Sequence, residues 1–330
     1  MIRLVREYTA AESRAVDVGA FVSRQQPSKS VTHPSNAVPT LSNECLMSIK
    51  ALIQFLSTLP QTNTASWVHE ALTGYGEVRA VYLTTSVAPM SEHVAKVAAS
   101  MQQPAARAPR EVHVLYHRGQ AGFQPWFDIM LQLMQAEQQN ASSLFDGMSW
   151  QARRLDTTAS IFSPLISSVS SLLPTLLPRL QHGLNAHRFV LLDFLAAASG
   201  VLGNDGQRWI ATLQQKQGPS GELPAAISAS YRNAQNLFSE FLRDVKVIPV
   251  QREHDALMVD VSDIARFGMR LLTHLVEYQD VLLILLQSVG ARTWTEPIGP
   301  AAPPDILYAE YIRDFLASLT TSLERAYLRK

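Results

Sequence analysis

The sequence has little cysteine, no excess of either charge and no long apolar run. Cys45 is the single cysteine of 330 residues, which excludes an intramolecular disulfide and a cysteine-based metal cluster. The 28 basic residues balance 28 acidic ones. The overall charge therefore does not favour binding to nucleic acid, whose phosphates require a basic surface. The densest apolar run, 189–198, is interrupted by Asp193 and is far shorter than the roughly 20 residues that cross a bilayer. The start of the chain also lacks the apolar core of a signal peptide. These absences predict a cytoplasmic protein that binds no nucleic acid.

A strand-like alternation of apolar and polar residues is also lacking. Instead, apolar residues recur at every third or fourth position from Leu155 to Leu202, which is the spacing of helices with one buried face. Prolines at 164, 174 and 178 predict kinks or a break in this segment. Similar stripes recur along the chain, so the sequence predicts an all-α fold in which neighbouring helices pack antiparallel. An elongated stack and a compact bundle give the same pattern.

Proline- and glycine-rich segments divide this helical pattern into expected parts. Residues 88–111 are expected to form a mobile loop with some helix at its start, and residues 257–289 one long helix. The expected domains are an N-terminal helix at 1–22, a linker at 23–41, a first bundle at 42–203 with central helices at 123–202, a loop at 204–224, and a second bundle at 225–330 that is incomplete at its C-terminus.

Metal-ligand patterns in the sequence are incomplete. His113 and His117 have the i, i+4 spacing that places two imidazoles on one helical face. No third ligand follows at a suitable spacing, and the neighbouring Arg110 and Arg118 oppose a cation. His69 and Glu70 begin a zincin-like motif, but Thr73 stands where the second histidine is required. We therefore predict no metal site and no cofactor.

Asp193 is the main candidate for chemistry, because a carboxylate inside an apolar run must be hydrogen-bonded or paired. His187 and Arg188 lie within reach on the same helix. A structural ion pair is the simpler interpretation, and an all-α enzyme using these three residues is the alternative. Two other patterns, the glycines at 200, 203 and 206 and the charged segment 252–255, fit ordinary loops, so no catalytic residue is predicted.

Several short motifs resemble, in order, those of the seventy-kilodalton (Exo70-type) exocyst subunit family. Residues 75–86 resemble its Y-x-x-[VI]-R-x-x-Y-L-x-x-S signature, and residues 116–119 resemble its Y-x-R-G element. Residues 184–195 are similar to the segment in which an Asn precedes an F-L-x-x-D-like helix, and residues 311–327 to a later family helix. The positions that carry the resemblance are Tyr75, Arg79, Tyr82, Tyr116, Arg118, Gly119, Asn185, Phe189, Asp193 and Glu324.

The resemblance implies a rod of stacked helical bundles without enzymatic activity. The implied role is to tether secretory vesicles to the plasma membrane, together with other exocyst subunits and Rho-type GTPases. The family usually continues past the position of Lys330 into further helical domains, so the chain is expected to be a truncated, fungal-like member. The family's phosphoinositide-binding patch is expected in that later part, beyond Lys330. His187 and Arg188 depart from the Thr-Asp pair usual in the family. The alternative is a helical adaptor of another tethering complex.

A second lipid hypothesis concerns arginines within this chain. Each of these arginines would contribute about 1 kcal/mol to the free energy of binding at an anionic membrane surface. A solvated face is the simpler interpretation. The arginines concerned are Arg107, Arg110, Arg118, Arg153 and Arg154.

Overall fold

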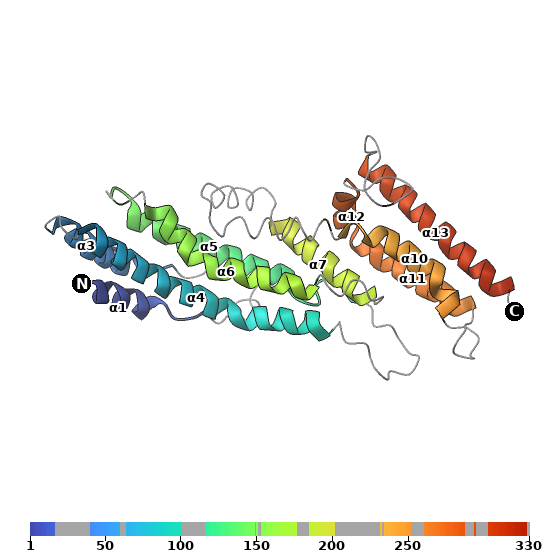
Figure 1. Cartoon of the computed structure of the whole chain (residues 1–330), viewed down its shortest axis with the longest axis horizontal. Helices are drawn as coiled ribbons and strands as arrows, with labels where there is room; N and C mark the ends of the chain where they lie inside the picture. Colours follow the sequence, from blue (N-terminus) through green and yellow to red (C-terminus); the bar gives the residue numbers. More distant parts are fainter. Residues whose placement is uncertain are drawn as a thin grey trace, which may run out of the picture. The chain divides into compact units, whose positions relative to one another are not determined.

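The described part of the chain is helical throughout its regular structure. A computed structural model describes residues 1–16, 40–59, 64–100, 116–148, 150, 153–176, 185–201, 232, 234–251, 261–287, 294 and 303–328. These residues contain α-helices and no strand (Figure 1), which confirms the all-α prediction. The helices form two compact units.

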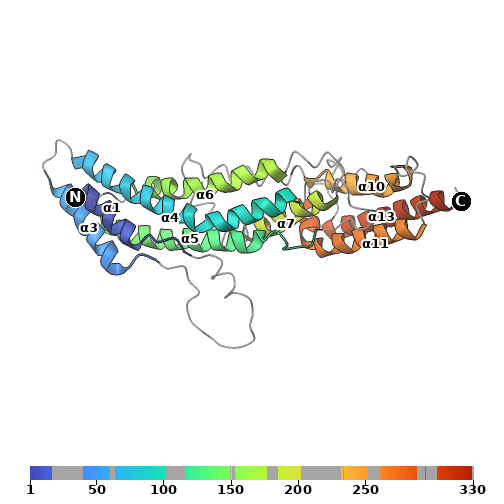
Figure 2. The ribbon, with the colours of Figure 1, turned by 90° about the horizontal axis from the view of Figure 1, so that it is seen from below.

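The first unit contains α1 (Ile2–Glu12), α3 (Asn43–Thr58), α4 (Thr64–Ser100) up to Lys96, α5 (Phe123–Phe145) and α6 (Arg154–Leu176) up to Leu173. Helices α4, α5 and α6 run side by side in both views (Figures 1 and 2), and α3 packs against α1 and α5. Helix α3 begins after Ser42, whose hydroxyl accepts a hydrogen bond from the Cys45 amide at 3.1 Å, as an N-cap residue does.

Two helix boundaries of the first unit differ from the sequence prediction. Helix α4 continues through Pro89 to Ser100, so the helix expected at the start of residues 88–111 is present but longer than expected. Residues 101–111 lie outside the described part of the chain. Val87 and Val94 are both buried, and their i, i+7 spacing keeps one apolar face in register across the proline. Helix α1 is shorter than expected and ends at Glu12.

The second unit contains the turn at 116–121, α7 (Asn185–Val201) up to Ser199, α10 (Leu237–Gln251), α11 (Val261–Glu277), α12 (Gln279–Leu286) and α13 (Pro304–Leu328). Helix α13 packs against α10, α11 and α12. Every residue from Phe189 to Ala198 on α7 is buried. The sequence pattern predicts this helix in the first bundle, whereas its contacts group it with the second unit, because the Phe189 ring packs on Phe241 and Tyr278.

The helix expected at 257–289 is interrupted at Tyr278, between α11 and α12. A guanidinium nitrogen of Arg118 donates a hydrogen bond to the Glu277 carbonyl, which an uninterrupted helix would use for its own ladder. The buried Tyr278 ring also lies 5.7 Å from the ring of Phe189, centroid to centroid. Long-range contacts therefore stabilise a break that helical periodicity does not signal.

Gly268 allows close packing of α11 on α13 and provides a test of this arrangement. A Cβ atom there would lie 2.4 Å from Leu319 Cδ1, so we expect Gly268→Ala to lower the free energy of unfolding by about 1–3 kcal/mol through overpacking. Chemical unfolding followed by circular dichroism measures the effect, and a second substitution, Leu319→Ala, should reduce it.

Gly76→Ala in α4 is the matched control. The nearest atom to its added Cβ would be Ser160 Oγ at 3.7 Å, an ordinary contact, so the gain in helix propensity should raise stability by about 0.5–1 kcal/mol. Equal effects of the two substitutions would contradict the proposed packing at Gly268.

Candidate functional site: two buried polar clusters

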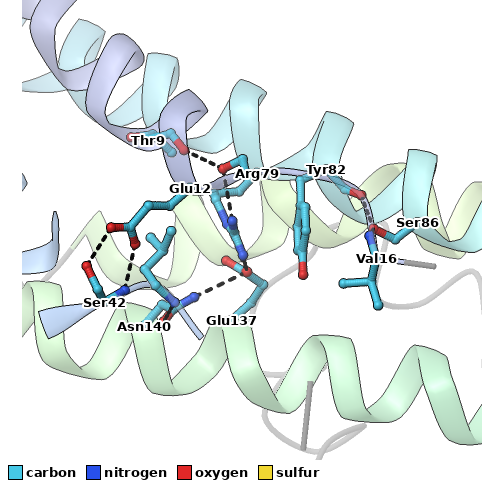
Figure 3. Close-up of polar contacts among 11 residues, drawn as sticks. Thr9, Glu12, Val16, Ser42, Arg79, Tyr82, Ser86, Glu137 and Asn140 are labelled. Atoms are coloured by element: carbon cyan, nitrogen blue, oxygen red, sulfur yellow. Dashed lines mark hydrogen bonds and ion pairs between the residues drawn. The ribbon is translucent and has the colours of Figure 1, made fainter. Parts of the chain in front are cut away.

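The first cluster joins α4 to α5 through Arg79 and Glu137 (Figure 3). Both side chains are buried, with 1% and 0% of their surface exposed. Arg79 Nε donates to Glu137 Oε1 at 2.9 Å, and Nη2 of the same guanidinium donates to that oxygen as well. Arg79 Nη1 donates to Ser13 Oγ at 2.9 Å, and the guanidinium carbon lies 4.0 Å from the centroid of the Tyr82 ring. The cation is therefore engaged by α5, by the end of α1 and by its own helix.

Asn140 and Glu12 extend this cluster to the segment before α3 (Figure 3). The Asn140 side chain donates to Glu137 at 3.3 Å and accepts a hydrogen bond from the Leu41 amide at 3.2 Å. The Glu12 carboxylate accepts hydrogen bonds from the Ser42 hydroxyl and amide, which lower the pKa of Glu12. One polar network thus connects α1, α3, α4 and α5.

Ionisation in this cluster favours the charged pair. Burial lowers the pKa of Arg79, but its hydrogen bond and charge interaction with Glu137 outweigh burial and raise the pKa overall. Arg79 thus stays cationic. Nearby, burial, aided by the charge of Glu12, raises the pKa of the Cys45 thiol to about 11, which keeps this cysteine protonated and unreactive at neutral pH.

The second cluster joins the turn at 116–121 to Asp193 of α7. The Tyr116 hydroxyl donates to Asp193 Oδ2, and the Gly119 amide donates to Oδ1 at 3.0 Å. The Tyr116 hydroxyl also accepts a hydrogen bond from the Ala121 amide at 2.9 Å. Gly119 has a φ of +82°, which glycine adopts at little cost. Burial raises the pKa of Asp193, and these two hydrogen bonds to the carboxylate oppose that shift.

Arg118 holds the same turn to α12. Its guanidinium forms two hydrogen bonds to the Asp280 carboxylate, at 2.9 and 2.6 Å, and lies 5.4 Å from the centroid of the Tyr278 ring. Partial burial raises the pKa of Asp280, but the hydrogen bonds from Arg118 outweigh it and lower the pKa overall. This bidentate geometry is the strong form of a carboxylate–arginine contact.

The pairing expected within α7 is replaced by long-range contacts. Arg188, 1% exposed, contacts Glu240 of α10 at 3.0 Å, and Asp193 is bound by Tyr116 and Gly119. The three residues of the enzyme alternative therefore do not form one constellation: Asp193 and Arg188 have separate partners, and the His187 side chain lies outside the described residues.

Of the remaining positions singled out in the sequence, some are buried in the core, some are exposed, and others lie outside the described residues. Tyr75 is fully buried on α4, the Phe189 ring packs in the core of the second unit, and Glu324 is exposed on α13. Asn185 is the first residue of α7, and its side chain lies outside the described residues, as do His113, Arg107, Arg110, Gly203, Gly206 and the segment 252–255. Of the other arginines, Arg153 contacts His69 at 3.0 Å and Arg154 donates to Ser142 at 2.7 Å.

Sequence reasoning missed the acidic partners Glu137, Glu240 and Asp280. Glu137 carried a detectable signal, because it is four residues from Leu133 and seven from Leu144 on the apolar stripe of α5, where a lone carboxylate needs a partner. The other two lie on partly exposed positions and gave no such signal.

Together, these contacts join helices and turns that lie far apart in the sequence, and Arg79, Tyr116, Arg118 and Asp193 all take part in them. A family model for the C-terminal part of the Exo70 exocyst complex subunit matches residues 121–327. The chain therefore belongs to the Exo70 family of exocyst complex subunits.

Solved structures agree in fold. The chain is similar to a structure of Saccharomyces cerevisiae Exo70 with additional residues, at 14% identity and a TM-score of 0.67, covering 99% of this chain and 54% of that one. It is also similar to the S. cerevisiae exocyst component Exo70p, at 13% identity and a TM-score of 0.68, covering 99% of this chain and 57% of that one.

This chain thus spans little more than half the length of these two structures. Comparison with curated proteins gave no match. Among the described residues, no helix is both long and apolar enough to span a membrane.

Removing Arg79 tests the first cluster. We expect Arg79→Met to lower the free energy of unfolding by about 3–5 kcal/mol, because Glu137 would remain buried without its cation. The double variant Arg79→Met/Glu137→Leu should recover much of this loss. Chemical unfolding of the full chain measures both.

The control for Arg79 is the exposed pair Arg3–Glu7, whose side chains are 90% and 53% exposed. Arg3→Met should cost less than about 0.5 kcal/mol. A loss at Arg79 as small as that at Arg3 would contradict the role of the buried pair.

Two buried tyrosines test the second cluster. We expect Tyr116→Phe to cost about 1–3 kcal/mol, because it removes a hydrogen bond from buried Asp193. Hydrogen exchange in the turn at 116–121 should rise with it. Tyr278 is equally buried, but its hydroxyl has no hydrogen-bond partner among the described residues, so Tyr278→Phe should change little. Equal effects of the two substitutions would contradict the assigned role of the Tyr116 hydroxyl.

Proposed function

We propose that this chain acts as an exocyst subunit that helps to tether secretory vesicles to the plasma membrane through protein–protein contacts. The observation that carries this proposal is the family match over residues 121–327. The likeness in fold to the yeast exocyst component supports it. Other exocyst subunits are the primary partners, at cytoplasmic sites next to the plasma membrane where secretion occurs.

The chemistry of the two polar clusters supports a scaffold rather than an enzyme. Asp193, the candidate for catalysis, uses both carboxylate oxygens to bind Tyr116 and Gly119. A carboxylate held in this way connects two segments and is poorly placed to exchange protons with a substrate. In this proposal the motif residues stabilise the packing of the helices, and the outward helix faces bind the partners.

Exposed apolar side chains on α3 and α13 are suited to such contacts. Met47 and Phe55 on α3 are 64% and 48% exposed, and Ile306 and Leu316 on α13 are 52% and 40% exposed. Side chains of this kind bind partner helices through modest apolar grooves. Rho-type GTPases and plasma-membrane phosphoinositides are secondary partners in this proposal.

Affinity purification of the tagged full chain from cells that express it tests the proposal. Quantitative mass spectrometry should find other exocyst subunits enriched at least about tenfold over a tag-only control. Recovery of a different tethering complex would favour the alternative adaptor, and recovery of no tethering subunit would contradict the proposal.

Two matched variants, Met47→Glu and Ile306→Glu, each place a charge on an exposed apolar position, one in each unit. Loss of exocyst capture with one of them, at unchanged circular dichroism and solubility, would locate the contact in that unit. Unchanged capture with both would contradict docking through these two positions.

A further inference from the structure

Three potential metal ligands converge at the second cluster although they are far apart in the sequence. His117 belongs to the turn at 116–121, and His274 and Glu277 lie on α11. One ligand atom from each of the three side chains lies within 4.8 Å of the others. Motif spacing does not reveal this grouping, because His274 and Glu277 follow His117 by more than 150 residues.

The local geometry of His274 and Glu277 suits a small cation. Their i, i+3 spacing places both side chains on one face of α11. His274 Nδ1 lies 3.4 Å from Glu277 Oε2, close to the edge of about 3.4 Å expected in a tetrahedral zinc site with ligands at 2.0–2.2 Å. His274 is 8% exposed, and apart from this contact with Glu277 its Nδ1 atom has no hydrogen bond among the described residues. A buried polar nitrogen of this kind requires a partner.

His117, from the turn at 116–121, is the third member of the set. Its ring centroid lies 5.3 Å from that of His274, and the two rings are tilted by 54°. The rings are therefore not stacked face to face. The Phe189 ring covers His274 with a centroid distance of 5.6 Å, and this apolar cover reduces competition from water. His117 is exposed, which leaves a path for an ion to enter.

The charges around these side chains allow a cation to bind. Imidazole binds a metal ion as a neutral ligand, and the Glu277 carboxylate would add one negative charge. The positive charge of the adjacent Arg118 would repel a bound cation, but the Asp280 carboxylate pairs with this guanidinium through two hydrogen bonds. The guanidinium charge is thus balanced on the side of α12.

We propose that His117, His274 and Glu277 bind a zinc-type divalent cation, with a fourth position open to water. Two histidines and one carboxylate form a donor set that zinc uses in proteins, and imidazole ligands favour zinc-type ions over magnesium or calcium. The ion would connect the turn at 116–121 to α11, parallel to the contact between Arg118 and Asp280. This proposal does not depend on the proposed exocyst role.

Binding of Zn²⁺ and Co²⁺ to the purified, chelator-treated full chain tests the proposal. Isothermal titration with Zn²⁺ should give one site, and Co²⁺ should give the visible absorption of a four-coordinate ion. Zn²⁺ should also raise the melting temperature, since a ligand that binds only the folded state stabilises it. Mg²⁺ at the same concentration should give no calorimetric binding signal and should not raise the melting temperature.

The variants His117→Ala and Glu277→Gln change exposed ligands, so neither is expected to impair folding. Each should weaken Zn²⁺ binding at least about tenfold and abolish the thermal shift. His93→Ala on α4 and Glu324→Gln on α13 change exposed residues of the same types elsewhere and should bind as the unmodified chain does. Absence of a Zn²⁺ site, or equal binding by all four variants, would overturn the proposal.

Discussion

Burial of the Arg79–Glu137 ion pair is the interaction on which the first unit depends. Neither group can lie in the core alone, because an unpaired buried charge costs several kilocalories per mole. Helices α4 and α5 must therefore meet at one register, the one that places the guanidinium on the carboxylate (Figure 3). Asp193 imposes a similar constraint in the second unit, where the turn at 116–121 must reach α7.

The fold class was predictable because helical periodicity is a local signal, and the stripes from 123 onward appear as α5 and α6. The helix ends were less predictable. Pro89 suggests a loop, yet buried Val87 and Val94 continue the apolar face of α4 past it. Tyr278 lies in an unbroken stripe, yet Arg118 takes the carbonyl of Glu277 and ends α11 there. In both cases tertiary contacts outweigh local propensity.

The candidate residues were predictable as positions but not as contacts. Family-like spacing selected Arg79, Tyr116 and Asp193, and burial of Asp193 implied a partner. The partners themselves lie far along the chain: Arg79 and Glu137 are 58 residues apart, and Arg118 and Asp280 are 162 apart. Such pairs depend on how helices pack, which one sequence does not encode in any local pattern. The grouping of His117 with His274 was unpredictable for the same reason, because the two residues are far apart in the sequence.

We infer that the family-like motif residues stabilise the two helical units, and we propose that the outward helix faces carry partner contacts. Hydrogen exchange of the unmodified full chain tests the stabilising role of the motif residues most directly, because amide protection reports the free energy of local opening. We expect the slowest exchange in α4 and α5 around Arg79 and Glu137 and in α7 around Asp193, and faster exchange in α1. Rapid exchange around these buried residues, at the rate of α1, would contradict the account.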